Sequence, residues 1–217
     1  MASPDEAVRR EGIAYVRKLL DAIHFMKGDM LGGIIYSCWP APVASLDYKK
    51  IAREKSMQSL REIAPICDAY GITYNLEVVN RFEQYLINTA AEGVEFVEEL
   101  GCPQVKLLLD AFHMNIEEDS IGDAIRLADK HIGHIHIGEC NRKVPGTGRM
   151  PWDEIFTALR DVDYSGRIVM EPFIRVGGEV GRDIRMYHDL SNNATDAQMD
   201  EMAAAGAAFV HNKLRLL

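Results

Sequence analysis

Short apolar segments of strand character alternate with longer amphipathic helical segments along this whole sequence, and this alternation most constrains the fold. The repeat recurs at about 30-residue intervals, which is the length of a strand–helix–strand unit. Such a pattern predicts a parallel sheet with its connecting helices on the outside. The expected strands cover residues 32–37, 74–79, 105–109, 133–137 and 167–170. The first expected helix begins near residue 3, and the later ones cover residues 47–70, 89–100, 121–130, 152–160 and 196–214.

Four of the expected strands end on a side chain that can bind a metal: Glu77, Asp110, His136 and Glu171. Any one of them alone would more often be a helix cap or a hydrogen-bonded core residue. Four in succession at the ends of apolar strands need a shared partner, because buried charge is costly unless it is compensated. Three carboxylates and one imidazole suit a divalent cation that prefers oxygen ligands. They favour Mn²⁺, Mg²⁺ or Co²⁺ over Zn²⁺.

Polar side chains at the carboxyl ends of several different strands favour a (β/α)8 TIM barrel over an open doubly wound sheet. The sequence has no glycine-rich dinucleotide fingerprint and no P-loop. It supplies only five strands, however, whereas a closed barrel of this kind needs about eight. We therefore expect residues 1–217 to form a single, partial TIM-barrel domain that lacks about the first three strands.

Composition limits the cellular setting and the partners. The chain is 47% hydrophobic and 26% charged, as an ordinary globular protein is, and has no apolar run long enough to span a bilayer and no N-terminal signal pattern. Its four cysteines are scattered and form no CxxC pair, which predicts a reduced, cytoplasmic protein. A formal net charge of −9 disfavours nucleic acid or an anionic membrane as the main partner.

Four longer motifs resemble those of the ketose 3-epimerases, the D-tagatose/D-psicose (allulose) 3-epimerase group of xylose-isomerase-like barrels. They are residues 76–83, 109–119, 133–146 and 169–173. The resemblance implies that one divalent metal, Mn²⁺ most often, Co²⁺ or sometimes Mg²⁺, is bound by Glu77, Asp110, His136 and Glu171. It implies that Glu83, His113 and Arg142 hold the O1–O2 end of the sugar, and that Glu77 and Glu171 exchange the C3 proton on opposite faces.

The same resemblance implies a free ketohexose substrate, with D-fructose/D-psicose or D-tagatose/D-sorbose as the interconverted pairs, and a homo-oligomer, either a dimer or a tetramer. Full-length members of that family carry further N-terminal strand–helix units. In this chain the contacts to sugar from those strands, and the closure of the barrel, are therefore in question. We expect either a longer natural protein or an assembly in which another chain covers the opening.

Three other functions stay open at this point. An aldose–ketose isomerase could use the same barrel, moving a proton between C1 and C2. A metal-dependent endonuclease of the same superfamily would need more histidine ligands, a zinc cluster and a basic groove, which this acidic chain does not suggest. A chain that only binds metal, without turnover, is the third.

Three further features are ambiguous. Trp39 either lines the sugar pocket or simply packs. His134 is expected to support His136 or to pack beside it, in preference to binding the metal directly. Residues 145–149 resemble a phosphate cradle weakly and are better explained as a plain turn.

Overall fold

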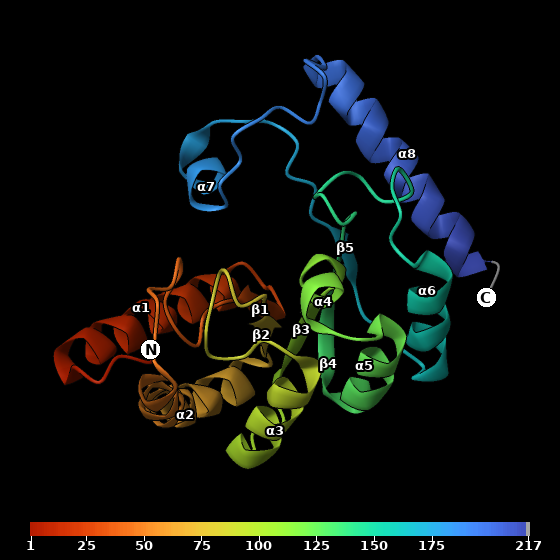
Figure 1. Cartoon of the computed structure of the whole chain (residues 1–217). Coiled ribbons are helices and arrows are strands. Elements are labelled where there is room, and N and C mark those ends of the chain that lie inside the picture. Colours follow the sequence, from red (N-terminus) through yellow and green to blue (C-terminus); the bar gives the residue numbers. More distant parts are fainter. Residues whose placement is uncertain (216–217) are drawn as a thin grey trace.

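The computed structural model describes residues 1–215 and contains one five-stranded sheet. Its strands lie in chain order and every neighbouring pair is parallel. The sheet curves, and helices cover its outer side (Figure 1), so the described residues form a half-barrel. This confirms the predicted architecture of a partial TIM barrel. The strands are β1 (Met30–Gly33), β2 (Thr73–Val78), β3 (Val105–Asp110), β4 (Ile132–Ile137) and β5 (Ile168–Met170).

Eight α-helices and one 3-10 turn complete the described residues. Five of the helices begin and end within two residues of the predicted positions, and the short α4 and α7 were not predicted. The helices are α1 (Glu6–Phe25), α2 (Leu46–Tyr70), α3 (Ala90–Leu100), α4 (Ala111–Glu117), α5 (Ile121–Ala128), η1 (Asp129–His131), α6 (Trp152–Asp161), α7 (Gly178–Asp183) and α8 (Asp196–Arg215). None of them is long and apolar enough to cross a membrane.

Local sequence explains where these helices start and stop. The side chains of Ser45 and Thr89 accept hydrogen bonds from the backbone N–H groups of Tyr48 and Glu92, and so cap α2 and α3. Both helices end at a glycine, Gly71 or Gly101, in the left-handed conformation that residues with a Cβ adopt only at a cost.

The first strand differs from the prediction. We expected residues 32–37, but β1 ends at Gly33, which has a φ of 134°. The chain then turns, and the side chain of Tyr36 is fully buried, with its hydroxyl donating to the carbonyl oxygen of Glu77 at 2.8 Å. The apolar run after Gly33 therefore forms a turn in which Tyr36 packs on β2 while Ile34 and Ile35 are partly buried, and it does not continue the sheet.

The two outer strands approach each other at their amino-terminal ends. Arg167, just before β5, makes a two-pronged ion pair with Asp29, just before β1, at 2.8 and 2.7 Å. Both side chains are more than half exposed, so the pair contributes little to stability. Among the described residues β1 and β5 each pair on one side only. The half-barrel is thus linked at its base by side chains and not by strand pairing.

Candidate metal and sugar site

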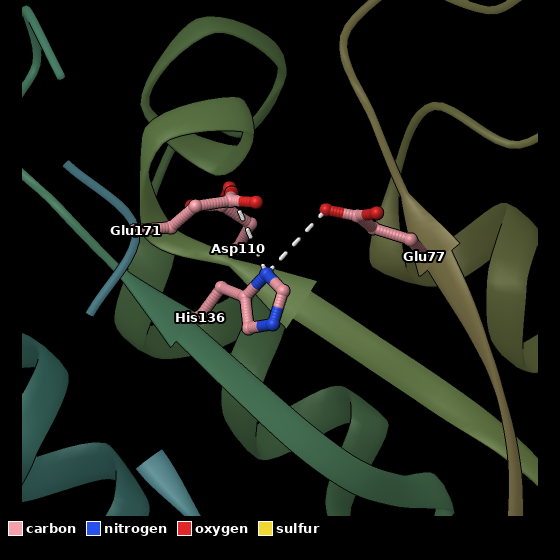
Figure 2. Close-up of side chains that lie close together, drawn as sticks. All are labelled: Glu77, Asp110, His136 and Glu171. Atoms are coloured by element: carbon pink, nitrogen blue, oxygen red, sulfur yellow. Dashed lines mark ion pairs between the residues drawn. The ribbon is translucent and has the colours of Figure 1, made fainter. Parts of the chain in front are cut away.

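The four predicted metal ligands converge at the carboxyl edge of the sheet. Glu77 is near the end of β2, Asp110 ends β3, His136 is near the end of β4, and Glu171 follows β5 directly. Because the strands are parallel and Asp110 pairs in register with His136, all four lie on one rim. One candidate ligand atom from each residue lies within 4.8 Å of the others. Figure 2 shows Glu77 on the opposite side of His136 from Glu171 and Asp110.

Asp110 has two structural roles. Its Oδ1 atom accepts from the backbone N–H of Phe112 at 2.9 Å and caps α4, while its Oδ2 atom accepts from Arg142 at 2.6 Å. Burial alone would raise the pKa of this fully buried carboxyl group. The charge of Arg142 and the two hydrogen bonds outweigh burial, so that the pKa of Asp110 is lowered. Asp110 is therefore an anion with one oxygen facing the cluster.

His136 is the residue that most directly indicates a cation-binding site. Its Nδ1 atom is buried and has no hydrogen-bond partner among the described residues. Glu171 Oε2 and Glu77 Oε1 lie 3.5 and 3.7 Å away from it. Burial alone would lower the pKa of His136, but the two glutamates outweigh burial and raise the pKa to about 10. A positive charge is needed at this point, and a proton on His136 supplies it when no metal does.

These residues fit a divalent metal ion. An unpartnered imidazole nitrogen and three carboxylates converge on one point, and such a donor set, mostly of oxygen, matches hard divalent cations. Buried carboxylates and an orphaned nitrogen are costly unless an ion or a proton compensates them. These four side chains, Glu77, Asp110, His136 and Glu171, could therefore hold one divalent metal, and we call them the metal cluster.

A cavity of about 320 Å³ adjoins this cluster, which is enough for a small ligand. Glu77 and Glu171 line it together with the three residues expected to bind sugar, Glu83, His113 and Arg142. Its remaining wall is largely apolar and includes Ile34, Ile35, Trp39, Phe173, Val180 and Ile184. Trp39 also donates from its indole N–H to Glu83 at 3.1 Å, so it lines the cavity and does not merely pack.

Arg142 connects the metal cluster with the cavity. Its Nη1 atom lies 2.6 Å from Asp110 and 3.1 Å from Glu171, and its Nη2 atom lies 3.1 Å from Nε2 of His113. The guanidinium stacks 3.9 Å above the ring of Phe112, a favourable cation–π contact. The backbone of Arg142 is left-handed, with a φ of 62°. The loop between β4 and α6 must therefore be held firmly to keep this arginine in place.

Glu139 holds that loop, and no separate pattern in the sequence points to this role. Its buried carboxylate accepts hydrogen bonds from Gly146 N at 2.7 Å, Met150 N at 3.1 Å and Trp152 Nε1 at 3.0 Å. The segment that resembled a phosphate cradle thus encloses a carboxylate of its own chain. A glutamate in a loop shows its partners only when the loop is folded, so this role could not be predicted from spacing.

His134 lies beside His136, with ring centroids 5.0 Å apart. Burial, the neighbouring charge of His136 and that of Arg167 lower the pKa of His134 to about 4. It is therefore a neutral side chain packed against His136, which agrees with the role expected from the sequence.

The chain matches the family model described as the xylose isomerase-like TIM barrel over residues 1–203. It therefore belongs to the xylose isomerase-like TIM barrel family. Within that family it is 49% identical over 209 residues to a D-psicose 3-epimerase of Ruminiclostridium cellulolyticum, covering 96% of this chain and 71% of the relative. It is 46% identical to a D-psicose 3-epimerase of Agrobacterium fabrum, covering 72% of that protein.

Solved structures agree with these relatives. A crystal structure of D-psicose 3-epimerase with D-tagatose from Clostridium cellulolyticum H10 superposes with a TM-score of 0.95 at 48% identity, covering 98% of this chain and 74% of the other. A structure of L-ribulose 3-epimerase superposes with a TM-score of 0.91 at 33% identity and covers 71% of that chain. The predicted kinship with the ketose 3-epimerases, and with it the class of carbohydrate isomerase, is confirmed.

Proposed function

We propose that this chain epimerises free ketohexoses at C3, interconverting D-fructose with D-psicose and D-tagatose with D-sorbose. One observation carries the proposal. Two of the four converging side chains, Glu77 and Glu171, line a cavity together with Glu83, His113 and Arg142. They do so in a chain that is 49% identical to a D-psicose 3-epimerase.

Glu77 and Glu171 are the proposed proton-transfer residues. Inverting C3 of a ketose requires a base that removes the proton next to the C2 carbonyl and an acid that delivers one to the other face. The two glutamates approach the cluster from opposite sides (Figure 2) and both line the cavity. Two identical carboxylic acids can exchange these roles, which lets the reaction run in both directions.

Glu83, His113 and Arg142 are the proposed sugar-binding residues at the O1–O2 end. Arg142 is a donor of fixed charge beside the cavity, and it is stacked on Phe112. Donors aimed at the oxygen that gains negative charge as the proton leaves stabilise the transition state more than the ground state. Glu83 can accept from a sugar hydroxyl at the same end.

Glu77, Asp110, His136 and Glu171 are the proposed ligands of one divalent metal, with Mn²⁺ favoured and Co²⁺ or Mg²⁺ as alternatives. When bound, such a metal supplies Lewis-acid polarisation of the sugar oxygens and neutralises the clustered carboxylates. The preference for Mn²⁺ rests on the oxygen-rich donor set and on the family resemblance.

We further propose a homo-oligomeric, cytoplasmic protein whose partner is the sugar itself and neither nucleic acid nor a membrane. The single-sided pairing of β1 and β5 among the described residues supports assembly with another chain. All four cysteines are free, which suits a reducing compartment, and the net charge of −9 supports the absence of a polyanionic partner.

An epimerase assay across a metal series tests the proposal. The protein is stripped with EDTA, reloaded with Mn²⁺, Co²⁺ or Mg²⁺, and incubated with D-fructose, D-tagatose or D-psicose. We expect the C3 epimer as product and no turnover before reloading. Glu171→Gln should lower kcat by about 10²–10⁴-fold, the usual contribution of a general acid or base. Glu201→Gln, on the exposed side of α8, should not change it.

Two outcomes would contradict the proposal. An aldose as product would identify an aldose–ketose isomerase on the same barrel. Metal binding that is weakened by Asp110→Asn, with no turnover of any ketose in the wild type, would identify a metal-binding chain without catalytic activity.

A further inference from the structure

His113 is enclosed between Asn80 and Arg142 at the edge of the cavity, and only 2% of its surface is exposed. The backbone nitrogen of Asn80 lies 3.2 Å from Nδ1 of the His113 ring, with hydrogen-bonding geometry. A backbone N–H can only donate. Nδ1 therefore accepts this bond and carries no proton.

The side-chain amide of Asn80 points at the same ring nitrogen. Its Nδ2 atom lies 2.7 Å from His113 Nδ1 and 3.3 Å from an oxygen of Glu83. Its Oδ1 atom accepts from the backbone N–H of Phe82 at 3.0 Å. Because the Glu83 carboxylate can only accept and the Phe82 N–H can only donate, the NH2 end of the Asn80 amide must face the ring. The backbone N–H and the side-chain NH2 of Asn80 thus both donate to Nδ1 of His113.

The other ring nitrogen must then carry the proton of the neutral imidazole. Nε2 of His113, however, faces Nη2 of Arg142 at 3.1 Å. A protonated Nε2 and the guanidinium N–H are both donors, so they do not form a hydrogen bond with each other. The nearest carboxylate oxygen to Nε2 among the described ion pairs is Asp110 Oδ2, at 3.7 Å, which is beyond a normal hydrogen bond. Two adjacent donors at a cavity wall need a common oxygen acceptor.

We propose that Asn80 is a positioning residue that holds His113 as the Nε2–H tautomer. His113 and Arg142 then present two donors to a single substrate oxygen, the O2 atom that gains charge as the C3 proton is removed. This inference rests on the proposed function for the identity of the oxygen, but the tautomer follows from the contacts of Asn80 alone.

Nitrogen-15 NMR of the Mg²⁺-loaded chain, labelled at histidine, tests the tautomer without any sugar. The His113 signals are assigned by their loss in His113→Gln. We expect Nδ1 to resonate as an unprotonated nitrogen and Nε2 as a protonated one. A protonated Nδ1 in the wild type would overturn the proposal. Because no turnover is measured, failure of the epimerase assay would leave this result standing, and the two proposals fail separately.

Two substitutions of Asn80 distinguish a positioning role from a structural one. Asn80→Asp replaces the side-chain donor with an acceptor, so a proton should move to Nδ1, and Nε2 should then accept from Arg142. That change removes one donor from the substrate oxygen, and we expect kcat to fall by about 10²-fold, as loss of such a donor does elsewhere. Asn80→Ala keeps the backbone donor, so the Nε2–H signature should persist and kcat should fall less.

The comparison has a clear contrary result. If Asn80→Asp keeps the wild-type nitrogen signature, or if both variants lose kcat equally with unchanged ring signals, Asn80 does not act on catalysis through the tautomer of His113.

Discussion

At the scale of single residues, the metal cluster is a set of charges that require one another. Glu77 and Glu171 lie within 3.7 Å of the His136 ring nitrogen, and Arg142 contacts Asp110 and Glu171. Removing any one member leaves the others with uncompensated charge in a partly buried place. We therefore expect a proton and a metal ion to compete for the cluster at His136.

This competition predicts proton release on metal binding. The pKa of His136 is raised from 6.5 to about 10 in the metal-free chain. The ring is therefore charged at neutral pH and loses its proton as the pH rises through about 10. At pH 8, Mg²⁺ or Mn²⁺ must displace that proton, and affinity should increase with pH up to about 10. Titration calorimetry in two buffers of different ionisation enthalpy should give about one proton released per metal bound.

The control for this measurement is His211→Gln, on the exposed side of α8, which should release the same number of protons. His136→Gln should lose the release and bind metal more weakly. Metal binding at pH 8 without proton release in the wild type would show that His136 is already neutral.

At the scale of elements, the sequence predicted most of what forms the metal cluster and less of what lines the cavity. The four candidate ligands could be predicted to lie together because each is at the end of an apolar strand, and parallel strands end on one edge. Helix α4 was missed because Asp110 caps it directly, with no turn residue between strand and helix. Helix α7 was missed because it begins at Gly177 and Gly178, which are signs of a loop in sequence.

Asn80 and Glu139 show a second limit of sequence reasoning. Both lie inside motifs that we quoted for the family resemblance, but neither carries a pattern that reveals its partner. Glu139 bonds to backbone N–H groups, which every sequence supplies, and Asn80 contacts His113 thirty-three positions away. Such roles depend on tertiary packing and not on local spacing.

The loop between β4 and α6 gives a prediction at this scale. Glu139→Gln should lower the free energy of unfolding by about 2–3 kcal/mol, because the amide cannot accept three hydrogen bonds as the carboxylate does. It should also raise KM, since the loop carries Arg142. Chemical denaturation and steady-state kinetics measure the two effects. Glu201→Gln, which is exposed, should change stability by less than about 0.5 kcal/mol; an equally small effect at Glu139 would contradict this role.

At the scale of the whole molecule, the half-barrel has two strands that are paired on one side only. Val169 of β5 is 42% exposed, and strand edges with exposed apolar side chains favour association. We expect the purified chain to unfold as a single domain and to form a dimer or a tetramer in solution. Native mass spectrometry or sedimentation tests this, and a monomer at micromolar concentration, active or not, would contradict the proposed assembly.

The central claim is that this metal cluster exchanges the proton at C3 of a ketose. The most direct test is incubation of the Mn²⁺-loaded chain with D-fructose in deuterated water, followed by NMR of the recovered sugars. The account predicts deuterium at C3 in D-psicose and in recovered D-fructose, with none at C1. Glu171→Gln should suppress this label, whereas Glu201→Gln should keep it. Label at C1, or an aldose product with C3 unlabelled, would contradict the account.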